Sequence, residues 1–478
     1  MTPDSPLAPH LRRTTIGVLA LVSLVAFEAM AVATAMPVAA RALDGLVLYA
    51  WAFTGFLITS LFATAVAGDL CDRFGPRPAV VGGVVVFALG LALAGAATSM
   101  VMFVAGRLVQ GLGAGGIIVG IYVLIGQAYP DRLRPRIFSY LSAAWVIPAV
   151  VGPIVAGTVA ENLTWRLVFY GLLPLVVAPV VLLWPLLCRA GPAEPAARLP
   201  GRVWLALVLA VGGAALQLGG QQLEHGAVPL GTATIATGAV LVGLSLRRLL
   251  PAGTLRLRRG LPSVVLLRGV QAGAFFGVEA FLPLMLVEHR GLSPTLAGAS
   301  LTGAALGWSA GAWWQGRPGL SIDRQRLAVA GSLLVLAGLV LTSSAVVAPT
   351  VPPVTAAVGW VIAGSGMGIT LSTLSVLLFR LAPPGEEGSS SAALQLSDAL
   401  GCVLTVGLGG VLYAALHDRA GAVAAAGGGG GEVDIAPEFA AVFAVMITAQ
   451  VLAVLVARRV LPRPGRQGAP ALRHVNVA

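Results

Sequence analysis

Residues 68–78 read GDLCDRFGPRP, a short polar stretch between two apolar runs at 47–67 and 79–98. Gly75 and Pro76 favour a tight turn, because glycine accepts backbone angles that other residues avoid and proline fixes its own. Two carboxylates and two guanidinium groups lie in the same stretch, so charge-assisted hydrogen bonds can form there. The stretch therefore predicts a charged loop that joins two membrane-crossing helices at the membrane surface.

The composition of the whole chain also indicates a membrane protein. Of the 478 residues, 57% are hydrophobic and 10% are charged, and the mean hydropathy is +0.91. A soluble domain carries about 25% charged residues, which solvate its surface. The composition therefore excludes a typical soluble enzyme, a disordered chain and a secreted disulfide scaffold. It predicts an all-α polytopic membrane protein, whose apolar outer faces lie in lipid.

Fourteen apolar stretches are long enough to cross a bilayer, which takes about 17–25 residues. An even number of crossings places both termini on one side of the membrane. The stretches lie at residues 14–39, 47–67, 79–98, 101–128, 137–160, 166–187, 203–221, 229–247, 263–286, 294–315, 327–347, 353–379, 391–416 and 437–457.

The distribution of arginine orients the helices. All 30 basic residues are arginine, and the net charge is +11. With the N-terminus inside, 24 arginines fall in inner segments, and only Arg41, Arg166, Arg290 and Arg419 fall in outer loops. This bias predicts a multi-pass protein of the cytoplasmic membrane with both termini in the cytoplasm, and it explains the net charge without a nucleic-acid partner. The inner segment at residues 248–262 could also lie on anionic lipid headgroups, but the general bias is the favoured explanation.

The stretch at 68–78 resembles the GxLaDrxGrr loop of the major facilitator superfamily. Its carboxylates can accept hydrogen bonds from its own arginines or from a helix N-terminus in the other half of the protein. We expect such a cluster to latch one conformation as two halves rock. A purely topogenic role explains the arginines but not the two aspartates. The expected latch consists of Gly68, Asp69, Asp72, Arg73, Gly75 and Arg77.

Two charged residues within the predicted helices are candidates for proton coupling. Arg107 begins RLVQGLGAGG, which resembles the superfamily's RxxqGxgaa pattern, in which the arginine is linked to proton coupling. Glu28 lies nine positions before Pro37, as the acidic residue does in the lDxTivNvALP motif of the 14-helix drug:proton antiporters. Both lie about 9–13 Å below the outer surface at 1.5 Å per residue. Because an intramembrane arginine costs at least ~2.5 kcal/mol without a partner, we expect Glu28 to be the protonatable carboxylate and Arg107 to tune it. The alternative for Arg107 is snorkelling to the outer interface.

The fifth apolar stretch contains PAVVGPIVAG at residues 148–157, which resembles the antiporter motif gxxxGPxxGG. The resemblance implies export rather than import. Gly152, Pro153 and Gly157 carry the match, and proline within a helix removes a backbone hydrogen bond and bends it. The small residues predict close packing against a helix of the other half.

Polar and aromatic residues, all but Trp145 in the second half, are candidates to line a central cavity. One helix carries Arg268, Gln271, Phe275 and Glu279 on one face. For Arg268 and Asp398, a buried structural charge is an equally good interpretation. Aromatic side chains could stack on a flat ligand, although packing or lipid contact explains each of them singly. The full candidate set is Trp145, Arg268, Gln271, Phe275, Glu279, Trp308, Gln395 and Asp398.

These motifs identify the chain as a member of the major facilitator superfamily, in its 14-helix drug:proton antiporter branch. The resemblance implies two six-helix bundles, at 1–188 and 261–478, with two extra helices in the linker at 189–260. It implies proton-coupled export of drug-like or metabolite-like amphiphiles by alternating access. Alternatives are an exporter of a lipid or endogenous metabolite, and a non-transporting receptor or scaffold.

The expected partners follow from this interpretation. They are a small-molecule substrate, protons and the lipid bilayer, and the protein is expected to act as a monomer. We expect no enzymatic activity, because no His, Asp and Ser groups converge at one interface. No metal or cofactor is expected, since the three cysteines and five histidines lack metal-ligand spacing.

Overall fold

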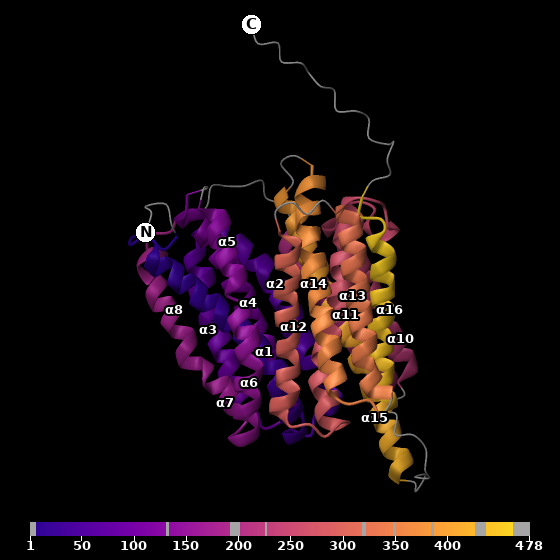
Figure 1. Ribbon diagram of the computed structural model, residues 1–478. Helices are drawn as coiled ribbons and strands as arrows, with labels where there is room; N and C mark the ends of the chain where they lie inside the picture. Colours follow the sequence, from indigo (N-terminus) through magenta and orange to yellow (C-terminus); the bar gives the residue numbers. More distant parts are fainter. Residues whose placement is uncertain are drawn as a thin grey trace.

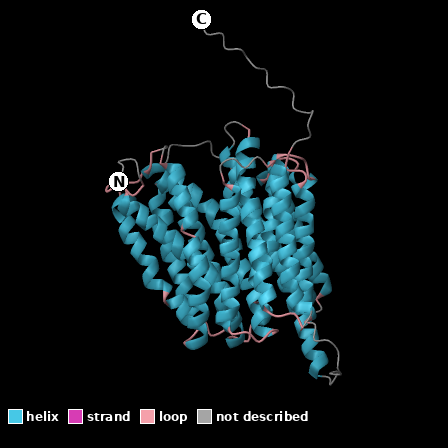
Figure 2. Cartoon of the chain, viewed as in Figure 1, coloured by secondary structure: helices cyan, strands magenta, loops and turns pink. Residues whose placement is uncertain are grey.

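The computed structural model describes residues 6–130, 133–191, 201–224, 227–317, 322–347, 350–383, 387–425 and 436–461, and the regular elements among them are all helices (Figure 2). The helices stand side by side in one bundle, with the first group on one side and the last group on the other (Figure 1). The first group comprises α1 Arg12–Ala42, η1 Leu46–Leu48, α2 Trp51–Phe74, α3 Pro76–Gly95, α4 Met100–Ala128, α5 Arg134–Ala143, α6 Val146–Asn162, α7 Arg166–Tyr170 and α8 Leu172–Leu187. Next come α9 Arg202–Glu224, α10 Val228–Leu249 and η2 Thr254–Arg256. The last group comprises α11 Leu261–Glu288, α12 Pro294–Gln315, α13 Arg324–Val347, α14 Val354–Leu381, α15 Glu387–Ala425 and α16 Pro437–Ala457.

Twelve of the described helices are long and apolar enough to cross a membrane. Two of the fourteen predicted stretches are not among them, so the count of fourteen is not confirmed. The helix α12 has 22 residues, but its many glycine, serine and tryptophan residues lower its hydropathy. The stretch at 137–160 is divided, and its longer part, α6, has only 17 residues.

The division between α5 and α6 has a local cause in Pro148. Proline has no amide hydrogen to donate to the carbonyl four residues earlier, and its ring crowds that carbonyl. That carbonyl belongs to Ala144, which lies at the break, and it accepts a hydrogen bond from Ser23 Oγ of α1 at 3.0 Å instead. The prediction of one continuous helix over 137–160 was therefore wrong.

The first and last groups meet along the bundle, which has two distinct ends. We call the end where α1 begins and α16 ends the termini side (top in Figure 1), and the other end the far side. The first and last groups contact each other directly through α6 with α12, α1 with α11 and α2 with α15. These contacts place a seam between the two groups, and the candidate site lies beside it.

Of the inserted pair, α9 packs onto both groups and α10 packs against α9. Helix α9 contacts α2 of the first group and α15 of the last. Thr54 Oγ1 of α2 donates to Gln217 Oε1 of α9 at 2.5 Å, and both side chains are buried. Because a buried hydrogen bond fixes this contact, α9 is part of the seam rather than a loose addition at the edge.

Candidate functional site

A buried polar cluster joins α1 and α4. Glu28 is fully buried and Arg107 is 3% exposed, and Arg107 Nη1 donates to Glu28 Oε1. Gln110 Nε2 donates to the same carboxylate oxygen at 3.1 Å, while Gln110 Oε1 accepts from Arg107 Nη1 at 2.9 Å. The other carboxylate oxygen, Oε2, is buried with no hydrogen-bond partner among the described residues. Arg107 therefore points inward to a desolvated ion pair and does not snorkel to the interface.

Helix α2 supplies further partners for the Arg107 guanidinium. Its Nε donates to the backbone carbonyl of Ala52 at 2.9 Å, and its central carbon lies 4.5 Å from the centroid of the Phe56 ring. A carbonyl oxygen and an aromatic face both stabilise a cation. Helix α2 therefore stabilises the guanidinium independently of the Glu28 carboxylate.

Glycines on α4 bring α2 close enough for these contacts. A Cβ atom added at Gly111 would overlap the Phe56 carbonyl, and one at Gly115 would lie 2.5 Å from the Ser60 carbonyl oxygen. Larger residues would push α2 away from Arg107. The glycines of the motif that begins at Arg107 therefore position the partners of the arginine itself.

On the far side the first and last groups are joined by several polar contacts. Arg41 Nε of α1 forms an ion pair with Glu288 of α11, and the Tyr49 hydroxyl donates to the Ala280 carbonyl at 2.7 Å. Thr295 Oγ1 of α12 donates to Glu161 Oε2 of α6 at 2.6 Å. These contacts close the seam at the far side.

Two of the three α6 residues that carry the motif match, Pro153 and Gly157, lie against α12. A Cβ added at Gly157 would lie 2.8 Å from the Thr295 Cα, and one added at Gly298 would lie 2.6 Å from the Pro153 carbonyl oxygen. Gly152 lies nearest Met30 of α1. The small residues thus allow two backbones from opposite groups to touch.

The loop at 68–78 lies at the termini side and makes contacts within its own group. Asp69 and Arg73 form an exposed i,i+4 ion pair at 2.9 Å, and the Arg77 guanidinium lies 5.0 Å from the Trp184 ring centroid. Gly75 has φ +79° at the turn into α3, a backbone conformation that favours glycine. No ion pair joins Gly68–Arg77 to the last group among the residues that the structure describes. Residues 384–386, which precede α15 in the last group, lie outside the described residues.

In the last group, Arg268 of α11 and Asp398 of α15 form an ion pair at 2.6 Å. Gln271 does not face an open space, because its Oε1 accepts from Ser332 Oγ at 2.7 Å and its Nε2 lies 3.4 Å from Met367 Sδ. Phe275 is 1% exposed and stacks on Trp360 with ring centroids 4.4 Å apart. The side chains on the predicted face of α11 therefore meet different partners: Arg268 pairs with Asp398, Gln271 with Ser332, and Phe275 with Trp360.

Glu279 differs from these neighbours. It has no hydrogen bond or ion pair among the described residues, although it lies near the middle of the sequence of α11. Glu279 and Phe276 alone remain partly exposed within 271–287, and the Phe276 ring lies 6.3 Å from that of Trp308. Gln395 is exposed on α15. A partly exposed carboxylate and aromatic rings therefore share one region of the last group.

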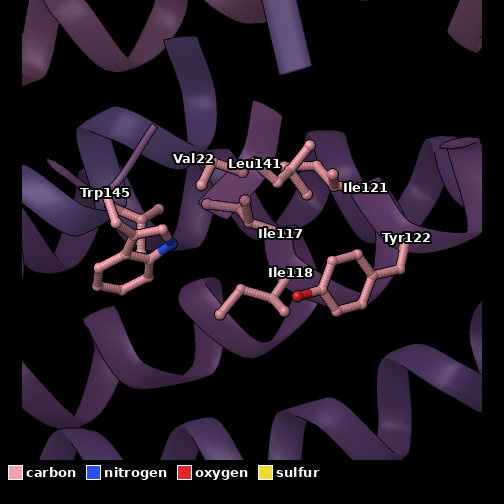
Figure 3. Close-up of a pocket in the computed structure, with 8 residues that line it drawn as sticks. Val22, Ile117, Ile118, Ile121, Tyr122, Leu141 and Trp145 are labelled. Carbon is pink, nitrogen blue, oxygen red and sulfur yellow. The ribbon is translucent and has the colours of Figure 1, made fainter. Parts of the chain in front are cut away.

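A cavity of about 200 Å³ opens in the first group near the break between α5 and α6. Trp145, which lies in the break, and Tyr122 of α4 lie on opposite sides of Ile117 and Ile118 (Figure 3). The walls are mainly apolar, and Val25 of the lining stands one helical turn from Glu28. Such a pocket suits an apolar ligand that carries few polar groups. Among the described residues no three His, Cys, Asp or Glu side chains gather as a metal site requires.

The sequence pattern of the Major Facilitator Superfamily matches residues 18–406. The chain belongs to this superfamily. This transporter is 29% identical over 386 residues to a probable multidrug-efflux transporter of Mycobacterium tuberculosis, covering 76% of this chain and 80% of that protein. The fold is similar to that of the POT family transporter PepTSo, with a TM-score of 0.69, 16% identity and coverage of 93% of this chain and 98% of the other. It is also similar to a D-xylose–proton symporter, with a TM-score of 0.64, 16% identity and coverage of 94% and 98%.

Because the chain belongs to this superfamily, the buried cluster lies in a multi-pass integral membrane transporter.

Gln110, Ala52 and Phe56 were not among the sequence-predicted site residues. Gln110 could have been found, because it lies three residues after Arg107 on the same helical face. The other two could not, because they reach Arg107 only through the packing of α2 on α4.

Proposed function

We propose that this transporter exports amphiphilic small molecules in exchange for protons by alternating access. The observation that carries the proposal is the buried cluster of Glu28, Arg107 and Gln110, in which one carboxylate oxygen has no hydrogen-bond partner within the described part of the chain. Within a membrane, buried ionisable groups are costly and are typical of proton and substrate pathways. The identity to a probable multidrug-efflux transporter supports amphiphiles as the cargo.

The cluster suggests how a proton could be bound and released. A proton on Glu28 Oε2 would neutralise the carboxylate and break its ion pair with Arg107. Removing one charge of a buried pair usually costs about 3–5 kcal/mol, but Ala52, Phe56 and Gln110 would retain the guanidinium. Since these partners sit on α2 and α4, a movement of either helix changes how readily Glu28 gives up its proton.

The asymmetry of the seam supports alternating access. Polar contacts join the groups at the far side, whereas the charged loop at 68–78 bonds within its own group at the termini side. This arrangement fits a state open toward the termini side. In the opposite state we expect the far-side contacts to break and the loop at 68–78 to bond across the seam, as a latch.

We further propose that all fourteen apolar stretches cross the membrane and that the termini side faces the cytoplasm. The 22 residues of α12 span about 33 Å at 1.5 Å per residue, enough for the hydrocarbon core. The broken stretch α5–α6 crosses in two parts, because Ser23 Oγ of α1 satisfies the carbonyl that is freed at the break.

A native cysteine offers a direct test of orientation. Cys188 is exposed at the termini side, next to the end of α8, whereas Cys71 and Cys402 are buried. A membrane-impermeant maleimide added to intact cells should leave the protein unlabelled and should label Cys188 after permeabilisation. Cys188→Ser is the control for site assignment. Labelling of Cys188 in sealed cells would place the termini outside.

Transport itself is tested in proteoliposomes with an imposed pH gradient and the amphiphilic dyes ethidium and rhodamine 6G. We expect accumulation of at least one dye against its gradient, and loss of this accumulation when a protonophore collapses the gradient. Accumulation that persists without the gradient would contradict proton coupling.

Glu279 allows a second, separable prediction. Glu279, which has no hydrogen bond or ion pair among the described residues, lies on the same face of α11 as Phe276 and would provide a counter-charge for a cationic substrate. Glu279→Gln should weaken transport of the cation ethidium about tenfold, since one charge-assisted contact contributes about 1.5–3 kcal/mol. Transport of a neutral dye should change little. Equal losses for ethidium and for the neutral dye would assign Glu279 to proton coupling instead.

A further inference from the structure

A basic surface lies at the termini side where α10, the segment 250–260 and the end of α16 meet. Its arginines are all exposed, and no ion pair is formed by any of them among the described residues. The sequence itself contains no Asp or Glu over 225–278 or 439–478, so neither flanking segment supplies a counter-charge. The surface consists of Arg247, Arg248, Arg256, Arg258, Arg259, Arg458 and Arg459.

The segment that carries three of these arginines has a defined backbone. Arg258 N donates to the Gly253 carbonyl at 3.1 Å, and Ser263 Oγ donates to the Arg258 carbonyl at 2.7 Å. Leu257 has φ +54°, a left-handed conformation that a leucine seldom adopts without support from its surroundings. The arginines are therefore presented by a folded turn and not by an unstructured linker.

This turn is also fixed to the last transmembrane helix. Gly260 N donates to the Arg459 carbonyl at 3.0 Å, and Arg459 Nη1 donates to the Leu257 carbonyl at 3.4 Å. Arg259 Nη1 lies 3.4 Å from the Arg458 carbonyl. Two runs of arginine that are distant in the sequence are thus held side by side despite their like charge, which raises the local positive potential.

The turn also exposes an apolar side chain beside these arginines. Leu255 is 53% exposed and lies next to Arg256, between the last residue of α10 and the first of α11. A leucine between the ends of two membrane-crossing helices can enter the acyl region while the neighbouring guanidinium groups bind phosphate. A soluble anion would gain nothing from the leucine, so this combination favours a lipid.

We infer that this surface is a binding site for anionic phospholipid headgroups, such as those of phosphatidylglycerol or cardiolipin. Arginine binds phosphate oxygens through two parallel N–H groups, which suits a phosphodiester. A bound headgroup would bridge the turn and the end of α16, and so would tie the inserted pair to the last group. The inference does not depend on the transported substrate or on proton coupling.

The test measures thermal stabilisation of the purified, delipidated protein by added lipid. Phosphatidylglycerol and cardiolipin should raise the melting temperature, whereas phosphatidylcholine, inorganic phosphate and glycerol 3-phosphate should not. Because a basic residue near an anionic membrane contributes about a fivefold gain in affinity, the triple variant R256Q/R258Q/R259Q should bind anionic lipid at least about tenfold more weakly. Leu255→Gln should weaken lipid binding without removing a charge.

The matched control removes three exposed arginines elsewhere on the termini side, in the variant R12Q/R13Q/R189Q. It should retain the wild-type response to lipid. An equal loss in the control, or an unchanged triple variant, would overturn the site. Stabilisation by inorganic phosphate alone would also overturn it, in favour of a free-anion site. If the triple variant does not fold, two other measurements decide whether these arginines bind anionic lipid. They are lipid binding by the double variant R256Q/R259Q and the salt dependence of lipid binding to the wild type.

Discussion

Glu28→Gln should abolish dye accumulation driven by a pH gradient while leaving the protein folded. Glutamine has nearly the same shape, so its amide oxygen can still accept from Arg107 and Gln110. It cannot take up or release a proton, and the buried cluster loses its only carboxylate. Because coupling requires a group that changes charge, the pH gradient would no longer drive transport. The measurement is ethidium accumulation in proteoliposomes with and without the gradient.

Two controls separate coupling from folding. Asp44→Asn makes the same chemical change at an exposed carboxylate with φ +47°, a conformation that asparagine tolerates, and should transport normally. Exchange of labelled for unlabelled dye without a gradient should persist in Glu28→Gln. If the variant still accumulates dye on a pH gradient, the proton site lies elsewhere, and Glu279 and Asp398 become the next candidates.

Gly298→Val should shift the protein away from the state described here. A Cβ at this position would lie 2.5 Å from Thr34 Cγ2 and 2.6 Å from the Pro153 carbonyl oxygen, both in the first group. The overlap exists only while the far side is closed, and overpacking of this kind costs about 1–3 kcal/mol. Since 1.4 kcal/mol is a factor of ten, the far-side-open population should rise about tenfold. Transport should fall although the charged cluster is untouched.

Spin labels at Asp44 and Leu296, exposed far-side positions in opposite groups, measure the opening directly. Their distance distribution should move to longer values in Gly298→Val and by less in Gly298→Ala. Gly82→Val is the control, because a Cβ at Gly82 meets nothing within 4 Å. A wild-type distance distribution in Gly298→Val, or the same shift in the control, would contradict a seam that opens at this contact.

Much of the architecture follows from local chemistry that is visible in the chain. Apolar length, few charges and arginine bias require many crossing helices, since lipid cannot satisfy exposed backbone groups. Glu28 and Arg107 could be paired in advance, because helix rise sets their depth and an intramembrane charge needs a partner. The break before Pro148 was not predicted, although the hydrogen bond that proline cannot make was a local signal for it.

Other features depend on which helices touch, and no local pattern encodes that. The third and fourth partners of Arg107 come from α2, which approaches α4 only where Gly111 and Gly115 leave space. Gln271 and Phe275 were expected in a cavity but meet Ser332 and Trp360, because α13 and α14 occupy that side of α11. Glu279, on the same helix, has no hydrogen bond or ion pair among the residues that the structure describes. Periodicity fixes the face on which a side chain lies, whereas only the packing of distant helices decides whether that face meets protein, an open cavity or lipid.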